Sequence, residues 1–250
     1  MTRLTRRTLL MGTTAALVAG CGSKAPADPT YAALPGPGDV DDKLSRIIPG
    51  KRRAALYELT APAAVKGAAK PLVTIVEYSD FQCPHCLTAA RALDELVVVY
   101  PDDVRIVFRH FPLPFHKQAE PAARASVAAG LQQRFWAMHD KLFANRGDLS
   151  DEAISGYASD LGLDGGKFAT DFASGAVADR VAAEMDEGRG LGVKGTPSMF
   201  INGVFVGGML KPDKLTEVID GERRVAEELI KAGSTREEIY ARFMRAAGAK

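Results

Sequence analysis

The sequence has few residues that could build a metal site or a disulfide scaffold. Its 250 residues include 3 Cys, 4 His and 1 Trp. A structural zinc site needs four ligands, commonly from two closely spaced pairs, and this chain holds one such pair of cysteines. The 32 basic side chains nearly balance 31 acidic ones, so no excess of positive charge indicates a nucleic-acid partner. We therefore expect no metal, no cofactor and no nucleic acid.

Cys83 and Cys86 form that single pair, within residues 81–86, shortly after an apolar, β-branched run at 72–76. Where a strand gives way to a helix, the first sulfur lies over the unpaired N–H groups of the first helical turn. Those donors and the helix dipole lower a thiol pKa from about 8.5 to roughly 3.5–7.5. The pair is thus predicted to be a redox dithiol with Cys83 as nucleophile. Two alternatives are half of a zinc site and a purely structural disulfide. Such a disulfide would stabilise the fold little, because the loop that it closes is short.

The N-terminus is predicted to be a targeting segment. Arg3, Arg6 and Arg7 precede an apolar stretch at residues 9–19 that is shorter than the roughly 20 residues needed to span a bilayer. A small-residue site follows and ends at Cys21. This segment resembles a bacterial lipoprotein signal peptide of the twin-arginine type, which implies removal of residues 1–20 and a lipid on Cys21. An ordinary secretory peptide is the alternative, and either form of export predicts a compartment where disulfides persist.

Beyond the signal, the pattern predicts a flexible tether at 21–53, one domain at 54–232 and a C-terminal helical extension at 233–250. Residues 22–38 are rich in Ala, Pro, Gly and Asp, as tethers are. A short helix at 39–51, a strand at 54–59 and a turn-like segment at 62–71 are expected before the domain's main sheet.

The domain pattern predicts an α/β fold of the thioredoxin-like type. Strands at 72–78 and 104–111 flank a helix at 83–99, which is the order of a βαβ unit. A helical insertion at 117–189 follows, with helices at 119–131, 134–143, 150–161 and 176–189. Two strands, 198–202 and 204–207, surround an Asn-Gly turn. An amphipathic pattern at 215–229 then predicts a helix that Gly233 terminates. Ser234 with Glu237 predicts a capping box for a last helix through Met244.

The chain resembles the DsbA-like branch of the thioredoxin superfamily. The resemblance rests on Glu77, the Cys83-Pro84-His85-Cys86 motif, the insertion, and Thr196-Pro197 before the hairpin. It implies that Pro197 is cis, with backbone beside it that pairs with an extended substrate, and that Glu77 is a buried acid serving Cys86.

Alternatives remain for each of these residues. Pro197 could be trans at the start of a strand, Glu77 a solvated strand-end acid and His85 an idle exposed side chain. His85 would otherwise favour the Cys83 thiolate through a hydrogen bond or its positive charge. We expect His116 and His139 to be structural.

These observations predict an envelope thiol:disulfide oxidoreductase that oxidises dithiols of exported proteins. Its expected partners are cysteine-containing exported proteins, a redox partner and a membrane that holds the lipid. Gly22 after Cys21 favours the outer membrane by resemblance to lipoprotein sorting signals. A reductase or isomerase is the alternative, because Thr196 stands where the oxidising enzymes carry valine. A second alternative is a non-enzymatic lipoprotein that binds or assembles partners.

Overall fold

The computed structural model describes residues 64–248. The signal segment, Cys21, the tether and the expected helix at 39–51 and strand at 54–59 lie outside these residues. The helices and strands follow in this order: β1 (Val65–Gly67), β2 (Val73–Ser79), α2 (Pro84–Val99), β3 (Val104–His110), α3 (Ala119–Gly130), α4 (Phe135–Ala144), α5 (Asp151–Asp160), α6 (Gly165–Ala173), α7 (Gly175–Gly190), β4 (Ser198–Ile201), β5 (Val204–Gly207), α8 (Pro212–Lys231), a 3-10 turn η1 (Arg236–Glu238) and α9 (Ile239–Gly248).

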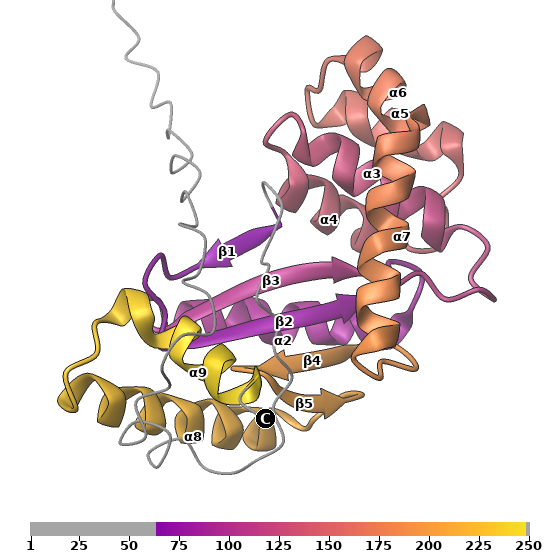
Figure 1. Cartoon of the computed structure of the whole chain (residues 1–250). Helices are drawn as coiled ribbons and strands as arrows, with labels where there is room; N and C mark the ends of the chain where they lie inside the picture. Colours follow the sequence, from indigo (N-terminus) through magenta and orange to yellow (C-terminus); the bar gives the residue numbers. More distant parts are fainter. Residues whose placement is uncertain (1–63, 249–250) are drawn as a thin grey trace, which may run out of the picture.

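The core of the fold is a mixed five-stranded sheet in the order β1-β3-β2-β4-β5 (Figure 1). Strands β2 and β3 are parallel and every residue of both is buried, as expected for strands covered on both faces. Helix α2 connects them, so the predicted βαβ unit is confirmed. The other neighbouring strands pair antiparallel.

The helical insertion α3 to α7 rises beyond the carboxyl ends of β2 and β3 (Figure 1). It joins the sheet closely where α7 crosses, because a Cβ on Gly188 would lie 2.8 Å from the Tyr78 ring. Glycine is therefore needed at Gly188 for this approach. The insertion has one more helix than predicted: α6 spans nine residues and is capped by Asp164, whose side chain accepts from the Lys167 N–H.

Two predictions near the ends of the domain were wrong. The turn-like segment at 62–71 contains β1, a three-residue edge strand held by antiparallel pairing with β3. The capping box is formed by Thr235 and Glu238 rather than by Ser234 and Glu237. Ser234 instead follows the end of α8, where its N–H bonds to the Leu229 carbonyl.

Helix α9 belongs to the main core. Ile239, Phe243 and Met244 are fully buried in the same cluster as β2 and β3. No helix between residues 64 and 248 has both the length and the apolar character that crossing a bilayer requires.

Candidate active site

Cys83 caps the N-terminus of α2 at the carboxyl end of β2. Its backbone is extended (φ −73°, ψ 122°), and Pro84 occupies the first turn, where the missing N–H costs no helical hydrogen bond. The Cys83 N–H donates to the Asp80 carbonyl at 3.1 Å. This turn places the Cys83 sulfur beside the free N–H groups of His85 and Cys86, as the sequence predicts.

The two thiols differ in acidity. The Cys86 thiol, as a hydrogen-bond donor, is the largest influence that lowers the pKa of Cys83 to about 5; burial opposes it, and the two backbone N–H groups add to it. Burial is also the main reason that the pKa of Cys86 is raised, and the proton that it shares with Cys83 raises it further. Cys83 is therefore a thiolate at neutral pH and Cys86 a buried thiol, which suits an attacking and a resolving sulfur.

The Thr196–Pro197 peptide bond is cis, as predicted. It brings the Thr196 backbone against the nucleophile: the Cys83 sulfur lies 3.6 Å from the Thr196 carbonyl oxygen, which accepts from it when Cys83 is protonated. The Thr196 hydroxyl is buried and lowers the pKa of Cys83. Strand β4 then begins at Ser198 and pairs with β2, which fixes this loop beside α2.

Glu77 is buried beneath the cysteines. Its side chain is 1% exposed and its Oε1 atom has no hydrogen-bond partner. Burial raises the pKa of Glu77 to about 7, against smaller opposing effects of the Ser79 hydroxyl and the Lys66 ammonium. Its charge in turn raises the pKa of Cys86, so the acid acts on the resolving sulfur.

Lys66 and Asp94 were not found from the sequence. They form an ion pair that links β1 to α2, and both influence the pKa of Glu77. Lys66 also lies over the Trp136 ring, 4.1 Å from its centre. Lys66 lies in a segment without an apolar period, so no signal in the sequence placed it near the redox pair.

His85 lies between the cysteines with an exposed side chain. Its backbone N–H contributes to the acidity of Cys83. The sequence predicts that the His85 imidazole acts on the Cys83 sulfur. In the structure, the His85 group that lowers the pKa of Cys83 is the backbone N–H.

Asp80 organises the loop before the nucleophile. Its carboxylate accepts the N–H groups of Gln82 at 2.7 Å and Leu113 at 2.8 Å. His116 Nδ1 lies 2.8 Å from the same carboxylate. The Asp80 side chain is fully buried, so the redox loop and the loop after β3 are held together by these bonds. His116 thus supports the loop, and Asp80 is a residue that the sequence analysis missed.

His139 lies deeper, on α4. It is buried beside Trp136, and burial lowers its pKa. Among residues 64–248 no group of three or more His, Cys, Asp or Glu side chains is placed to hold a metal ion.

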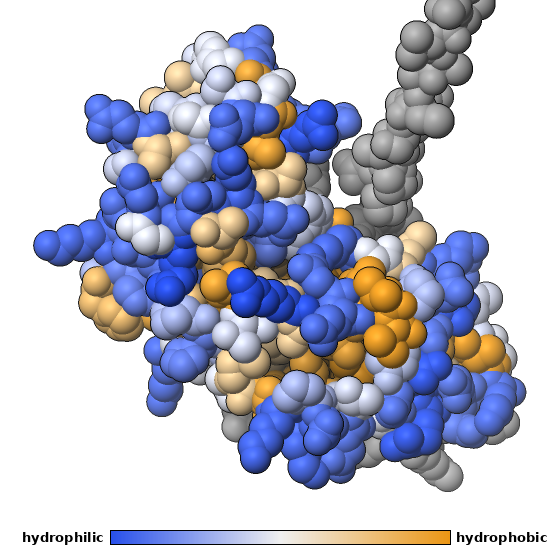
Figure 2. All heavy atoms as spheres, turned by 180° about the vertical axis from the view of Figure 1, so that it is seen from behind, coloured by the Kyte–Doolittle hydropathy of each residue, from blue (hydrophilic) through white to orange (hydrophobic). Residues whose placement is uncertain are grey.

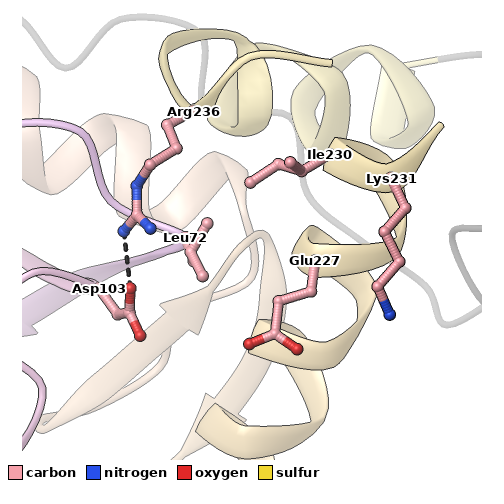
Figure 3. Close-up of a pocket in the computed structure, with 6 residues that line it drawn as sticks. All are labelled: Leu72, Asp103, Glu227, Ile230, Lys231 and Arg236. Carbon is pink, nitrogen blue, oxygen red and sulfur yellow. Dashed lines mark hydrogen bonds and ion pairs between the residues drawn. The ribbon is translucent and has the colours of Figure 1, made fainter. Parts of the chain in front are cut away.

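A pocket of about 360 Å³ lies at the other end of the sheet (Figure 3). Leu72 and Asp103, at the starts of β2 and β3, form one side, and α8 and the turn after it form the other. Asp103 is bound there by Arg236, as the dashed line in Figure 3 marks. This pocket is separated from Cys83 by the length of the strands and is not part of the redox site.

Large apolar side chains are exposed at several places on the surface. The face seen in Figure 2 shows apolar areas among polar surface. Val98 and Val99, 79% and 65% exposed, lie at the far end of α2, about 24 Å along the helix from its start. Phe115 is 72% exposed and adjoins His116, so it lies on the loop tied to the nucleophile.

Comparison with known proteins decides the family. The DSBA-like thioredoxin domain matches residues 74–220, which include both cysteines, Glu77 and the cis-proline. The chain belongs to the DSBA-like thioredoxin family. It is therefore a thiol–disulfide oxidoreductase by family, with an α/β thioredoxin-like fold as predicted.

Solved structures agree with this assignment. A thioredoxin-like oxidoreductase from Silicibacter pomeroyi is 31% identical, with a TM-score of 0.60, and the match covers 65% of this chain and 92% of that one. DsbA2 of Pseudomonas aeruginosa is 29% identical, with a TM-score of 0.57 and coverage of 66% and 96%.

Part of a protein named as an ion transporter is also similar to this chain. A Na⁺/H⁺ antiporter NhaA 1 from Salinispora arenicola is 42% identical over 140 residues, which are 56% of this chain and 21% of the antiporter. The matched residues thus span about a fifth of that relative's length.

Proposed function

We propose that the protein is an oxidant of dithiols in exported proteins, acting in the cell envelope. The observation that carries the proposal is the position of Cys83 at the N-cap of α2, beside backbone N–H groups that help to lower its pKa to about 5. A nucleophile that is stable as a thiolate stabilises the reduced enzyme relative to its disulfide. An enzyme whose reduced form is stabilised gives up its disulfide readily, so it oxidises its substrates.

The proposed reaction is two thiol–disulfide exchanges. A substrate thiolate attacks Cys83 in the enzyme disulfide, the bond between the cysteines breaks, and Cys86 leaves as a thiolate that takes up a proton. A second substrate thiolate then attacks the substrate sulfur of the mixed disulfide and releases Cys83 as a thiolate. The substrate has lost two electrons to the two enzyme sulfurs, and a separate redox partner must reoxidise the enzyme.

The location follows from the N-terminal sequence. Arg6 and Arg7 before the apolar stretch, and Cys21 after it, support export and lipid attachment on the extracytoplasmic side of a membrane. Cys21→Ala should release the protein from the membrane fraction or leave it unprocessed. Unchanged membrane attachment would contradict the lipid anchor.

The redox potential of the Cys83/Cys86 pair, measured by equilibration with glutathione, tests the proposed direction. If the enzyme is an oxidant, the potential of the pair should be nearer to about −120 mV than to the value of about −270 mV for thioredoxin. A potential close to the thioredoxin value would reject the oxidase.

A reductase or isomerase is the second candidate, and one observation favours it. Thr196, rather than the valine of the oxidising enzymes, lies against Cys83. Such an enzyme would rest in its reduced form in the cell, which trapping of free thiols in freshly lysed cells would detect. A protein that only binds or assembles partners would keep its cellular function in the Cys83→Ser variant.

A further inference from the structure

The resolving cysteine needs a route for its proton. Cys86 is fully buried, and its raised pKa means that it must lose or gain a proton whenever it forms or leaves a disulfide. Water has little access to a fully buried sulfur, so the proton has to pass through protein groups. Glu77, with a pKa of about 7, can accept or give a proton near neutral pH.

The Ser79 side chain acts on both of these groups. It is two residues after Glu77 on β2, and side chains two apart on a strand lie on the same face. That face is the one covered by α2: Phe108, the register partner of Glu77 on β3, packs in one cluster with Cys86. Ser79 is the last residue of the strand and precedes the short loop that leads to Cys83 at the start of α2.

The Ser79 hydroxyl has no other role in the described structure. Its side chain is buried, and its Oγ atom, like Oε1 of Glu77, has no hydrogen-bond partner. A buried hydroxyl without a partner is costly to stability, so its presence at this position needs an explanation. The hydroxyl lies close enough to lower the pKa of both the Glu77 carboxyl and the Cys86 thiol, although it is bonded to neither in this structure.

We propose that Ser79 is the proton relay between Cys86 and Glu77. When Cys86 attacks the mixed disulfide at Cys83, its proton passes to the Ser79 oxygen as the Ser79 proton passes to the Glu77 carboxylate. The new bond joins the two enzyme sulfurs, and the substrate leaves as a thiolate. In the reverse direction Cys86 leaves as a thiolate and receives its proton from the Glu77 carboxyl by the same path. The relay uses the redox pair alone, so it does not depend on which direction dominates in the cell.

Other charged groups surround the relay and must be held constant in its test. Lys66 from β1 and Asp94 from α2 act on Glu77. His110, the register partner of Ser79 on β3, and His139 from α4 lie against Phe108. The proposed substitutions leave these four groups unchanged, so a difference in pH profile between variants reports on Ser79 and Glu77.

The test separates the two exchange steps. Reduced enzyme is mixed with oxidised glutathione, quenched with acid at intervals and analysed by mass spectrometry. Attack by Cys83 forms a glutathione mixed disulfide, and attack by Cys86 removes it. Ser79→Val and Ser79→Thr differ only in the hydroxyl, and Ser79→Ala avoids added bulk. Ser234→Ala is a matched control, because Ser234 is also buried with an unpartnered hydroxyl but lies after α8.

We expect Ser79→Val and Ser79→Ala to leave the first step unchanged and to slow the second on the order of 10-fold. Ser79→Thr should restore it, and Ser234→Ala should match the wild type. In the wild type the rate of the second step should rise with pH near 7, and this rise should disappear in Ser79→Val. In a Glu77→Gln background, Ser79→Ala should have no further effect on that rate.

An unchanged second step, or an equal loss in the Glu77→Gln background, would overturn the relay while leaving the redox function intact. Failure of the wild type to react with oxidised glutathione would overturn both.

Discussion

Two sets of polar side chains at opposite ends of the sheet differ in their hydrogen bonds. At the carboxyl ends of β2 and β3, the Glu77, Ser79 and Thr196 side chains have buried oxygen atoms without hydrogen-bond partners. At the amino ends, the Asp103 carboxylate is bound by Arg223 at 2.6 Å and by Arg236 at 2.6 Å. The first arrangement costs stability and the second provides it.

This difference distinguishes side chains that can take part in the reaction from side chains that hold the fold together. Unpaired groups near Cys83 can bond to a thiolate or move a proton, because no stronger partner holds them. The paired charges around Asp103 instead fix α8 and the turn after it to the start of β3. Substitutions at the redox end are therefore expected to change activity, and substitutions around Asp103 are expected to change stability without changing activity.

The largest expected effect is on activity at the redox end. Cys83→Ser should lower the rate of thiol exchange by more than about 1,000-fold, because a serine hydroxyl is not ionised at neutral pH. Its midpoint of thermal unfolding at neutral pH should fall below that of the reduced wild type, because the thiolate that stabilises the reduced fold is lost. Cys86→Ala should accumulate mixed disulfides on non-reducing gels and Cys83→Ala few; equal trapping by both would contradict the assigned roles.

Glu77→Gln should stabilise the protein. The pKa of Glu77 is raised to about 7, so above its unfolded value the folded state binds more protons, and the carboxyl lowers stability as the pH rises from about 4.5 to 7. Removing the ionisable group should therefore raise the free energy of unfolding by about 3 kcal/mol at pH 8 and by little at pH 4. Urea unfolding of both proteins at the two pH values measures this. A gain of equal size at both would show that the charge is not its cause.

Asp103→Ala should have the opposite effect at the other end. It removes the partner of two guanidinium groups and should lower the free energy of unfolding by about 2 kcal/mol. Partial burial opposes ionisation, but Arg236 and Arg223 together lower the pKa of Asp103 overall. The wild-type advantage should thus be present above the unfolded pKa and be lost in acid. The redox potential should not change; a shifted potential would break the proposed separation of the two ends.

Much of the redox site could be predicted from local sequence. Buried β-branched residues in β2, and a proline after Cys83, specify a strand that ends in a helix cap with a thiol on it. The cis bond before Pro197 was predicted by family resemblance rather than by local physics.

What was missed depends on contacts between distant segments. β1 is three residues long and exists through its pairing with β3, so no periodicity marks it. The capping box was placed one residue too early because Ser234 and Thr235 each precede a glutamate at the same spacing. Lys66 reaches Asp94 and His116 reaches Asp80 only in the folded chain, across 28 and 36 residues.

The smallest expected effect, a change in potential without a change in fold, comes from Thr196→Val. Valine has nearly the shape of threonine but lacks the hydroxyl that helps to lower the pKa of Cys83. The pKa of Cys83 should rise, and Cys86 stays protonated in the reduced enzyme in either case. The reduced form then loses stability relative to the disulfide, so the potential should fall by about 10–30 mV, where 30 mV corresponds to about 1.4 kcal/mol. Glutathione equilibration measures the potential, and ultraviolet absorbance of the thiolate against pH gives the matching pKa. Because the hydroxyl has no hydrogen-bond partner, the free energy of unfolding of the oxidised form should stay the same or rise. A potential that stays constant while the pKa rises would separate the acidity of Cys83 from the oxidising power of the pair.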